Sequence, residues 1–325
     1  MLIDTHVHIF PEIAGIGAKR NTRVLPIYDD IGRLRRIDRL DKEPSNDNTL
    51  TSKDSKLSSA DKRFEHSPQM LISNMDWAQV DKAVLLQAPF YGKHNDYVAK
   101  AVKLFPERLI GTAYLDPWDQ DCHGEFEKIV DSGSFKAIKI ELSETCGFLN
   151  IYPNARLTMP EIWWLWKEME KHGLILVFDL GAVASKSYQT DEIRQITDKH
   201  PDLKIAICHL AQPTPLVEAN PVLWEKWKEQ IDLGKLPNVW FDTASLPAYV
   251  QQDERYPYPS AGKYIRIAID RIGPEKIMWG TDLPMTLTYA TYPEHVKMSR
   301  SHVTFLSAED QRKIFAENAM LLYGI

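Results

Sequence analysis

The stretch Leu2-Ile3-Asp4-Thr5-His6-Val7-His8 is a short β-rich run that ends in two histidines. Side chains two residues apart on a strand project to the same face, so this spacing places both imidazoles side by side where the strand ends. Two histidines buried together need polar partners or an ion to compensate for lost water. His6 and His8 are therefore predicted to belong to a metal-binding or catalytic site.

Seven further β-rich runs recur along the chain, and most are followed by a longer segment with helical spacing. The eight runs cover residues 2–6, 82–87, 109–115, 137–141, 174–178, 204–208, 238–241 and 276–279. Strands that alternate with helices predict a parallel sheet, and eight of them suffice for a closed barrel. An open doubly wound sheet usually carries a glycine-rich phosphate turn, and no GxGxxG or P-loop follows any run. The predicted fold class is α/β, a (β/α)8 TIM barrel.

Helices are predicted at residues 96–105, 160–172, 190–200 and 308–323. Residues 41–69 interrupt this rhythm because Ser, Asp, Lys and Asn dominate them. We expect a polar surface insertion between the first and second strands, on the catalytic face of the barrel. A lid and an insertion without function are equally compatible with this composition. The whole chain, 1–325, is interpreted as a single barrel domain.

The composition excludes several classes of function. Hydrophobic residues make up 44% of the chain and charged residues 26%, which provides a sizeable core. The net charge is −6 and no dense Lys/Arg run occurs, so no nucleic-acid partner is predicted. Cys122, Cys146 and Cys208 are too few and too scattered for a disulfide framework, which favours a cytoplasmic protein. Neither a signal peptide nor a long apolar run is recognisable, so no membrane contact is expected.

Two further residues complete the predicted site. His209 follows the sixth run, and Asp282 follows the eighth in Gly280-Thr281-Asp282. Barrel enzymes place their active sites at the carboxyl ends of the strands, and closure makes strands eight and one neighbours. The predicted ligands of one divalent metal ion are His6, His8, His209 and Asp282. Asp282 and His209 are the predicted catalytic residues: Asp282 takes a proton from water, while the histidines, directly or through the ion, polarise a carbonyl group.

Polar residues after other strands are candidates for substrate binding. Lys139 and Glu141 alternate with isoleucines and share a face of the fourth run. Lys139 could meet a substrate carboxylate there, although an internal Lys–Glu pair that serves only the fold fits equally well. The other candidates follow the second, fifth and seventh runs: Gln87, Tyr91, His94, Asn95, Asp179 and Asp242. The remaining histidines are predicted at the surface or at helix ends: His66, His123, His172, His200, His295 and His302.

The pattern resembles the amidohydrolase-related family of metal-dependent hydrolases and decarboxylases. The similarity lies in the His-x-His motif, in His209, in Gly280-Thr281-Asp282 and in residues 318–324, and it extends from residue 3 to 324 outside the insertion. Residues 84–95, 178–180 and 200–213 are most similar to the branch of sugar-acid lactonases and 2-pyrone-4,6-dicarboxylate lactonases. This resemblance implies that water opens a small lactone. It also implies one divalent ion, zinc or manganese, although some members of the branch work without a metal.

The pattern leaves three alternatives to a lactonase. The resemblance also admits a non-oxidative decarboxylase of an aromatic or unsaturated acid, similar to aminocarboxymuconate-semialdehyde decarboxylase. That branch ends its fifth strand in a metal-binding histidine, and here Asp179 stands in that place. TatD-like nucleases begin similarly but usually carry Glu-Thr-Asp on the last strand, where this chain has Gly280-Thr281-Asp282. A binding protein without activity is disfavoured by the intact set of histidines and Asp282. The expected partner is a small-molecule substrate, and a homodimer is left open.

Overall fold

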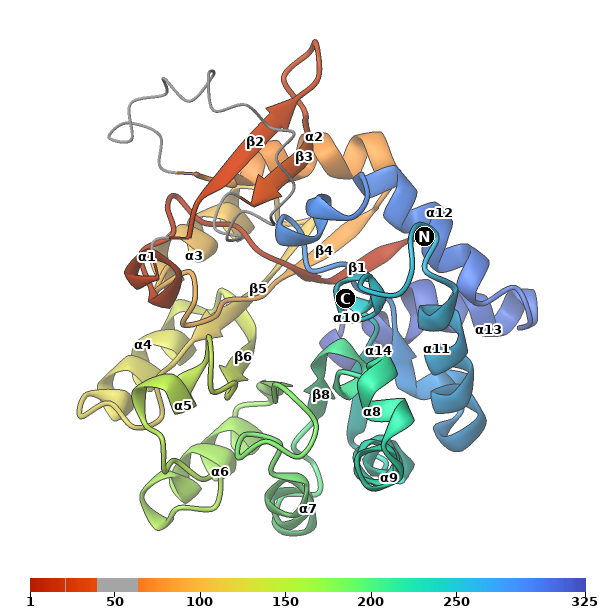
Figure 1. The fold of residues 1–325 in the computed structure, drawn as a ribbon. Coiled ribbons are helices and arrows are strands. Elements are labelled where there is room, and N and C mark those ends of the chain that lie inside the picture. Colours follow the sequence, from red (N-terminus) through yellow and green to blue (C-terminus); the bar gives the residue numbers. More distant parts are fainter. Residues whose placement is uncertain (21, 40–63) are drawn as a thin grey trace.

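The computed structural model describes residues 1–20, 22–39 and 64–325. Eight parallel strands form one sheet in which each strand pairs with the next one along the chain (Figure 1). They are β1 (Ile3–Val7), β4 (Lys82–Leu85), β5 (Leu109–Tyr114), β6 (Phe135–Glu141), β7 (Ile175–Asp179), β8 (Ile205–Ile207), β9 (Val239–Asp242) and β10 (Ile277–Met278). The sheet curls into a nearly closed barrel, so the predicted (β/α)8 fold is confirmed.

Helices lie around the outside of this barrel (Figure 1). The longer ones are α2 (Pro68–Ala78), α3 (Asn95–Leu104), α4 (Cys122–Ser132), α6 (Trp163–Lys171), α7 (Thr190–Lys199), α9 (Pro221–Ile231), α11 (Pro259–Ile272) and α12 (Tyr292–His302). Shorter ones are α1 (Ile16–Lys19), α5 (Phe148–Ile151), α8 (Pro215–Ala219), α10 (Leu246–Val250), α13 (Ala308–Arg312) and α14 (Asn318–Tyr323). A π-helical turn, Lys313–Glu317, joins α13 to α14, so the predicted closing helix is present in three parts. In the described ranges, no helix is both long and apolar enough to cross a membrane.

The strands are buried on both faces, as expected for a parallel barrel. On β6, Ile138 and Ile140 pack outward into the large apolar layer between strands and helices, whereas Ala137 belongs to the smaller cluster inside the barrel. Because side chains alternate along a strand, Lys139 and Glu141 face the interior with Ala137. The predicted shared face of Lys139 and Glu141 is therefore the inner one.

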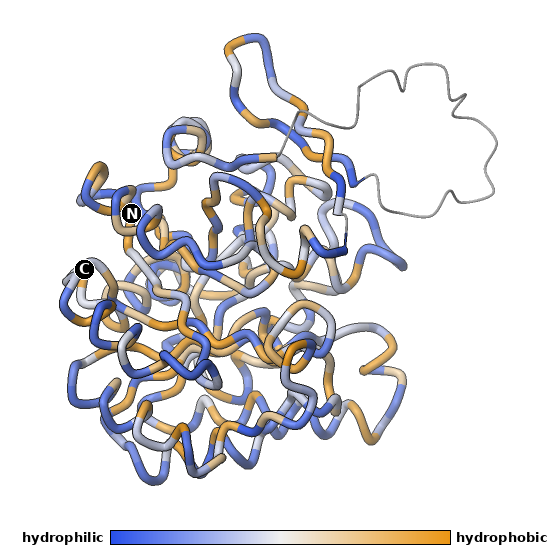
Figure 2. The backbone as a smooth tube through the Cα atoms, turned by 90° about the vertical axis from the view of Figure 1, so that its left-hand side faces the viewer, coloured by the Kyte–Doolittle hydropathy of each residue, from blue (hydrophilic) through white to orange (hydrophobic). Residues whose placement is uncertain are grey.

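A two-stranded antiparallel sheet follows β1 and was not predicted. It pairs β2 (Val24–Tyr28) with β3 (Leu34–Arg39). Figure 2 shows this hairpin projecting from the barrel, with hydrophilic and hydrophobic residues mixed along it. Most of the predicted insertion, 41–69, lies outside the described residues. At its predicted end, Phe64 and His66 are buried and α2 begins at Pro68, with Ser67 Oγ accepting a hydrogen bond from the amide of Met70.

The seam between β1 and β10 differs from the rest of the barrel. β10 has only two residues, so closure depends on the residues that follow it. Thr5 N donates to Trp279 O at 3.0 Å, His8 N to Leu283 O at 2.7 Å, and Asp282 N to His6 O at 2.7 Å. Trp279 N donates in turn to Ile314 O of the C-terminal segment at 2.9 Å. The chain therefore closes its barrel through loop residues and through its last helices.

Asp4 reinforces this seam with its carboxylate. Its Oδ1 accepts from the amides of His6 at 3.1 Å and Thr281 at 3.0 Å. Its Oδ2 accepts from Thr281 Oγ1 at 2.5 Å and from Tyr292 Oη at 2.9 Å. One buried side chain thus connects the histidine-bearing strand to the segment that leads into Asp282. Sequence analysis did not single out Asp4, because its partners lie 277 and 288 residues away.

Candidate active site

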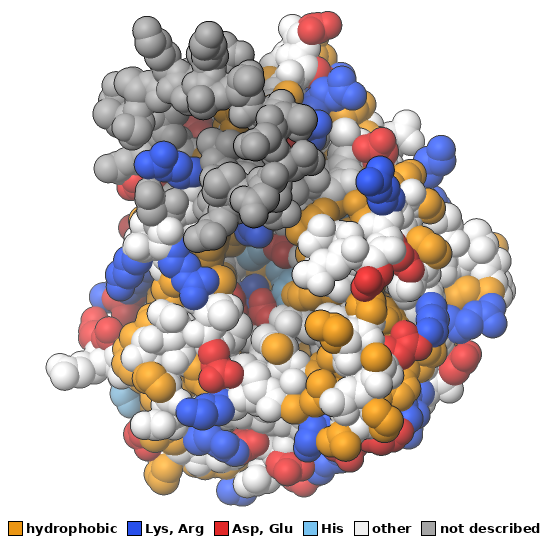
Figure 3. All heavy atoms as spheres, viewed as in Figure 1, with side chains coloured by type: hydrophobic (Ala, Val, Ile, Leu, Met, Phe, Trp, Pro, Cys, Tyr) orange, Lys and Arg blue, Asp and Glu red, His pale blue; other side chains and the backbone are white. Residues whose placement is uncertain are grey.

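A cavity of about 410 Å³ lies at the carboxyl ends of the strands. Figure 3 shows a hollow in this face with histidine and acidic side chains at its bottom. The ionisable residues that line the cavity, cysteine and tyrosine aside, are His8, Arg39, Lys139, Glu141, Glu144, Asp179, His209 and Asp282. The predicted position of the site, at the mouth of the barrel, agrees with this arrangement.

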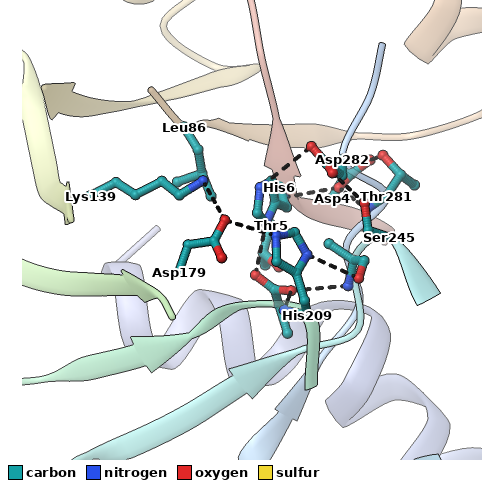
Figure 4. Close-up of polar contacts among 12 residues, drawn as sticks. Asp4, Thr5, His6, Leu86, Lys139, Asp179, His209, Ser245, Thr281 and Asp282 are labelled. Atoms are coloured by element: carbon teal, nitrogen blue, oxygen red, sulfur yellow. Dashed lines mark hydrogen bonds and ion pairs between the residues drawn. The ribbon is translucent and has the colours of Figure 1, made fainter. Parts of the chain in front are cut away.

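His6 and Asp282 lie close together beside the seam (Figure 4), and His8 converges on the same point. His8 Nε2 lies 2.9 Å from Asp282 Oδ1, and His6 Nε2 lies 3.7 Å from the same oxygen. The three donor atoms all lie within 4.8 Å of one another. His6 Nε2 is fully buried and has no hydrogen-bond partner, which is unusual for a buried polar atom.

The other ring nitrogen of each histidine determines what this cluster can bind. His8 Nδ1 lies 2.8 Å from the carbonyl oxygen of Leu86, so it must be the donor. His6 Nδ1 lies 3.0 Å from Asp242 Oδ2 and donates to that carboxylate. Burial lowers the pKa of both rings, and to about 4 for His6, which is therefore neutral. His6 Nε2 therefore presents a lone pair, and His8 Nε2, which shares a proton with Asp282 Oδ1, would present a second one on losing that proton. Together with the carboxylate of Asp282, this donor set fits a divalent cation such as zinc.

Asp242 holds His6 and the segment after β8 together. Besides His6, its carboxylate accepts from the amides of His209 at 2.8 Å and Ala244 at 3.0 Å. It is buried and does not line the cavity, so the predicted substrate contact of Asp242 is not what the structure offers. Its position is that of a carboxylate that orients a metal-binding histidine.

Asp282 is held as an ionised carboxylate. Burial would raise its pKa, but the hydrogen bond with His8 and the charges of His8 and His209 outweigh burial and hold the pKa of Asp282 well below its usual range. Its Oδ2 accepts a hydrogen bond from Ser245 Oγ. Asp282 and Ser245 both have left-handed backbone conformations, φ 68° and 58°. Non-glycine residues adopt this conformation rarely, and such residues cluster at functional sites. Sequence analysis missed Ser245.

A second group of charges lies on β6, on β7 and just after β8. Asp179 Oδ2 is 3.4 Å from Lys139 Nζ and 3.0 Å from His209 Nε2 (Figure 4). His209 Nδ1 is 3.1 Å from the carbonyl oxygen of Ala244, so both ring nitrogens of His209 are donors and the ring is an imidazolium. Burial lowers the pKa of His209, but the charge of Asp179, its hydrogen bond and the charges of Asp282 and Asp242 raise it to about 9.

His209 therefore lies close to the cluster of His6, His8 and Asp282 but does not direct a ring nitrogen into it. The His6 and His209 rings lie 4.7 Å apart, yet His209 points its Nε2 at Asp179. Metal binding by His209 stays a prediction, and it would require loss of a proton. Lys139 pairs with Asp179, so the Lys139–Glu141 pair that sequence analysis considered gives way to this one.

The predicted substrate contacts after β4 divide into two kinds. Tyr91 lines the cavity, with its ring 4.6 Å from that of His8. Gln87 and Asn95 do not line it: Gln87 Nε2 donates to Asn95 Oδ1 at 2.9 Å and to Thr112 O at 2.7 Å, and Asn95 bonds the backbone of Tyr114. His94 likewise bonds backbone carbonyls. These three residues connect a loop to the barrel.

Two histidines predicted at the surface or at helix ends are buried instead. His66 Nδ1 donates to the carbonyl oxygen of His8 at 2.6 Å, and His295 Nε2 lies 3.1 Å from that of Thr286. Burial lowers the pKa of each to about 4, which keeps both rings neutral. The prediction failed because their partners are backbone atoms that no residue pattern reveals.

Comparison with known proteins places this geometry in context. The model of the family described as Amidohydrolase matches residues 3–325. No curated protein matches the sequence. Among solved structures, a probable 2-pyrone-4,6-dicarboxylic acid hydrolase from Acinetobacter baumannii with bound citric acid is similar, at a TM-score of 0.67 and 16% identity, over 100% of this chain and 99% of that one.

Two further structures match over 100% of this chain and 99% of their own chains. An amidohydrolase from Burkholderia multivorans with bound zinc has a TM-score of 0.69 at 13% identity. A 5-carboxyvanillate decarboxylase from Sphingomonas paucimobilis has a TM-score of 0.60 at 17% identity. At these identities the three likenesses concern the fold. They include a protein described as a hydrolase and one described as a decarboxylase.

Proposed function

The chain belongs to the amidohydrolase family, and from this membership we propose that it is a metal-dependent hydrolase that opens a small carboxylated or sugar-derived lactone by attack of water. One observation carries the proposal: the same cavity is lined by the ionised carboxylate of Asp282 and by two cations, Lys139 and His209, from other parts of the barrel. Hydrolysis of a lactone needs a base for water and positive groups for the carbonyl oxygen.

His6, His8 and Asp282 would hold the metal ion, in keeping with their converging donor atoms. A bound divalent ion supplies Lewis-acid activation at this point. Asp282 takes a proton from water as the water oxygen bonds to the carbonyl carbon. His209 and Lys139 stabilise the negative charge that develops on the carbonyl oxygen. When the ring carbon–oxygen bond breaks, the leaving alkoxide takes the proton from Asp282, which restores the carboxylate.

Asp179 favours hydrolysis over decarboxylation in this proposal. Its carboxylate is directed to Lys139 and His209 and away from the cluster of His6, His8 and Asp282. A histidine at this place would add a neutral nitrogen donor to the site, as the decarboxylase branch requires. The alternative, a non-oxidative decarboxylase, would release carbon dioxide from an acid and leave a lactone ring closed.

The test is turnover of a panel of sugar lactones and pyrone carboxylates by wild type and Asp282→Asn, with ring-opened acid and carbon dioxide measured separately. We expect ring opening, and a fall of roughly 10²–10⁴-fold in Asp282→Asn because the base is lost. Asp232→Asn is the control, since Asp232 pairs with Arg271 away from the cavity. An Asp282→Asn variant with most of its rate would remove Asp282 from this role, and carbon dioxide without ring opening would identify the decarboxylase.

Elemental analysis before and after chelation tests the metal. About one zinc or manganese per chain, with activity lost on removal, supports the proposed site. Lactone hydrolysis by metal-free protein would leave the histidines as hydrogen-bond donors and would refute the assignment of the ion.

A further inference from the structure

Glu141 is a buried carboxyl group in the cavity that the proposed reaction does not use. It is the last residue of β6, it lines the cavity, and only 6% of it is exposed. Its hydrogen-bond partner is a neutral group, Ser143 Oγ, which donates to Oε1 at 3.0 Å. Within the described ranges, no cation lies within ion-pairing distance of Glu141, because its neighbour Lys139 pairs with Asp179 at 3.4 Å.

Burying a carboxyl group in this position costs free energy unless a ligand donates hydrogen bonds to it. Burial and the nearby charge of Asp179 raise the pKa of Glu141 to about 7, against the effects of Lys139 and Ser143. Above this value the group is an anion whose oxygens can accept further hydrogen bonds. A substrate hydroxyl would satisfy it, whereas a substrate carboxylate would meet like charge in a partly desolvated space.

The charges around the cavity also favour a substrate hydroxyl over a substrate carboxylate. Four carboxyl groups line it and three cations oppose them: Glu141, Glu144, Asp179 and Asp282 against Arg39, Lys139 and His209. Two of the cations are engaged by Asp179. The side chains alone therefore give the cavity no cation excess, and the proposed ion would add its charge at His6, His8 and Asp282 rather than at Glu141. Neutral hydrogen-bonding side chains occupy other parts of the lining: Ser143, Thr145, Ser185 and Gln212.

We propose that Glu141 is a specificity-determining residue that accepts a hydrogen bond from a hydroxyl group of the substrate and excludes a carboxylate from the same place. The preferred substrate is then a polyhydroxylated lactone with an uncharged side chain. This inference rests on the proposed lactone hydrolysis and narrows it to a substrate class.

A matched pair of substrates tests the inference. Galactono-1,4-lactone and galactaro-1,4-lactone differ only in a terminal CH2OH that is a carboxylate in the second. At pH 8, wild type should have the higher kcat/KM for the galactonolactone. Glu141→Gln keeps the size and removes the charge, so the ratio should move toward the galactarolactone by about tenfold or more, since like-charge contacts govern selectivity. Glu141→Asp should keep the wild-type preference.

Glu144→Gln is the matched control, because Glu144 lines the same cavity but is exposed, where charge is screened. Its ratio should stay near the wild-type value. A Glu141→Gln variant that loses activity equally on both lactones, or keeps the wild-type ratio, overturns the inference. Thermal unfolding establishes that each variant is folded. If Glu141→Gln does not fold, the wild-type ratio decides, since a wild type that prefers the galactarolactone refutes the inference directly.

Binding separates this inference from the proposed reaction. Calorimetry with the open-chain acids, galactonate and galactarate, needs no turnover. If wild type opens no lactone, the proposed hydrolysis fails, and a preference for galactonate that Glu141→Gln abolishes would still support the role of Glu141. If lactones are opened but galactarate binds wild type as well as galactonate does, the hydrolysis stands and the inference about Glu141 fails.

Discussion

The two sides of the cavity are built by different means. On one side, β5, β6 and β7 pair along several residues each, and the backbone ladder positions Lys139 and Asp179. On the other side, β10 has two residues, and Asp282 reaches its place through loop hydrogen bonds and the carboxylate of Asp4. The first side, here called the ladder side, carries the charges of Lys139 and Asp179. The second, the seam side, carries the converging donor atoms of His6, His8 and Asp282. Side-chain substitutions should therefore alter charge on the ladder side and alter geometry on the seam side.

The largest effect is expected on the ladder side, as a pH dependence of stability. The pKa of His209 is raised to about 9 in the folded protein, against about 6.5 for an unfolded histidine. The charge of His209 contributes up to about 3 kcal/mol to the free energy of unfolding. This contribution is complete below about pH 6.5 and is lost as the pH rises through about 9. In Asp179→Asn, the free energy of unfolding should fall much less as the pH rises, because the carboxylate that raises the pKa of His209 is gone. The measurement is the free energy of unfolding at pH 6.5 and 9.5 in both proteins.

Zinc affinity at pH 7 is the control for this substitution. It should be the same in Asp179→Asn and wild type, because the ladder keeps the backbone in place. An Asp179→Asn variant with the wild-type pH dependence would show that His209 is not held as an imidazolium by Asp179, and a large loss of zinc affinity would contradict the separation of the two sides.

Asp242 connects the two sides, and its substitution should have the next largest effect. In Asp242→Asn, the amide would face His6 Nδ1 as a donor, so the ring would carry its proton on Nε2 and lose the lone pair directed at Asp282. Zinc affinity should fall about 10–100-fold, measured by competition with a chelating indicator. Asp232→Asn serves as control. Equal affinities in Asp242→Asn and wild type would show that Asp242 does not set the tautomer of His6.

The smallest effect is expected at the seam. Tyr292→Phe removes one of four hydrogen bonds to Asp4 and leaves the aromatic ring in place. The free energy of unfolding should fall by about 1 kcal/mol, with a slight loss of zinc affinity. Tyr264→Phe is matched, since Tyr264 Oη donates to Glu218 away from the seam. If both variants lose stability equally and neither changes zinc affinity, the Asp4 network does not position the ligands.

Most of the barrel could be predicted from the sequence, because its strands are buried on both faces and its helices alternate with them. All eight strands fall within two residues of the predicted runs at each end. The hairpin β2–β3 was missed because its residues are partly exposed and Pro26 lies inside a strand. The convergence of His6, His8 and Asp282 was readable from barrel closure, since the first and last strands must meet.

The remaining features depend on contacts that no spacing encodes. Ser245 and Asp4 act through side-chain hydrogen bonds to distant loops, and His66 acts through a backbone carbonyl. The protonation of His209 depends on the direction of its ring, which places Asp179 at one nitrogen and Ala244 O at the other. Sequence analysis could place these residues at strand ends and could not orient them.

The seam also determines the order in which the molecule can be assembled. His8 and Asp282 are 274 residues apart, and the edge of β10 is completed by Ile314. During synthesis, β1 is made first, and the segment after β10 that hydrogen-bonds to it is made only when almost the whole chain has been synthesised. Contacts of such sequence separation carry the largest loop-closure cost and form late. We therefore expect the cluster of His6, His8 and Asp282 to form last, so a nascent or truncated chain can carry most of the barrel without the proposed site.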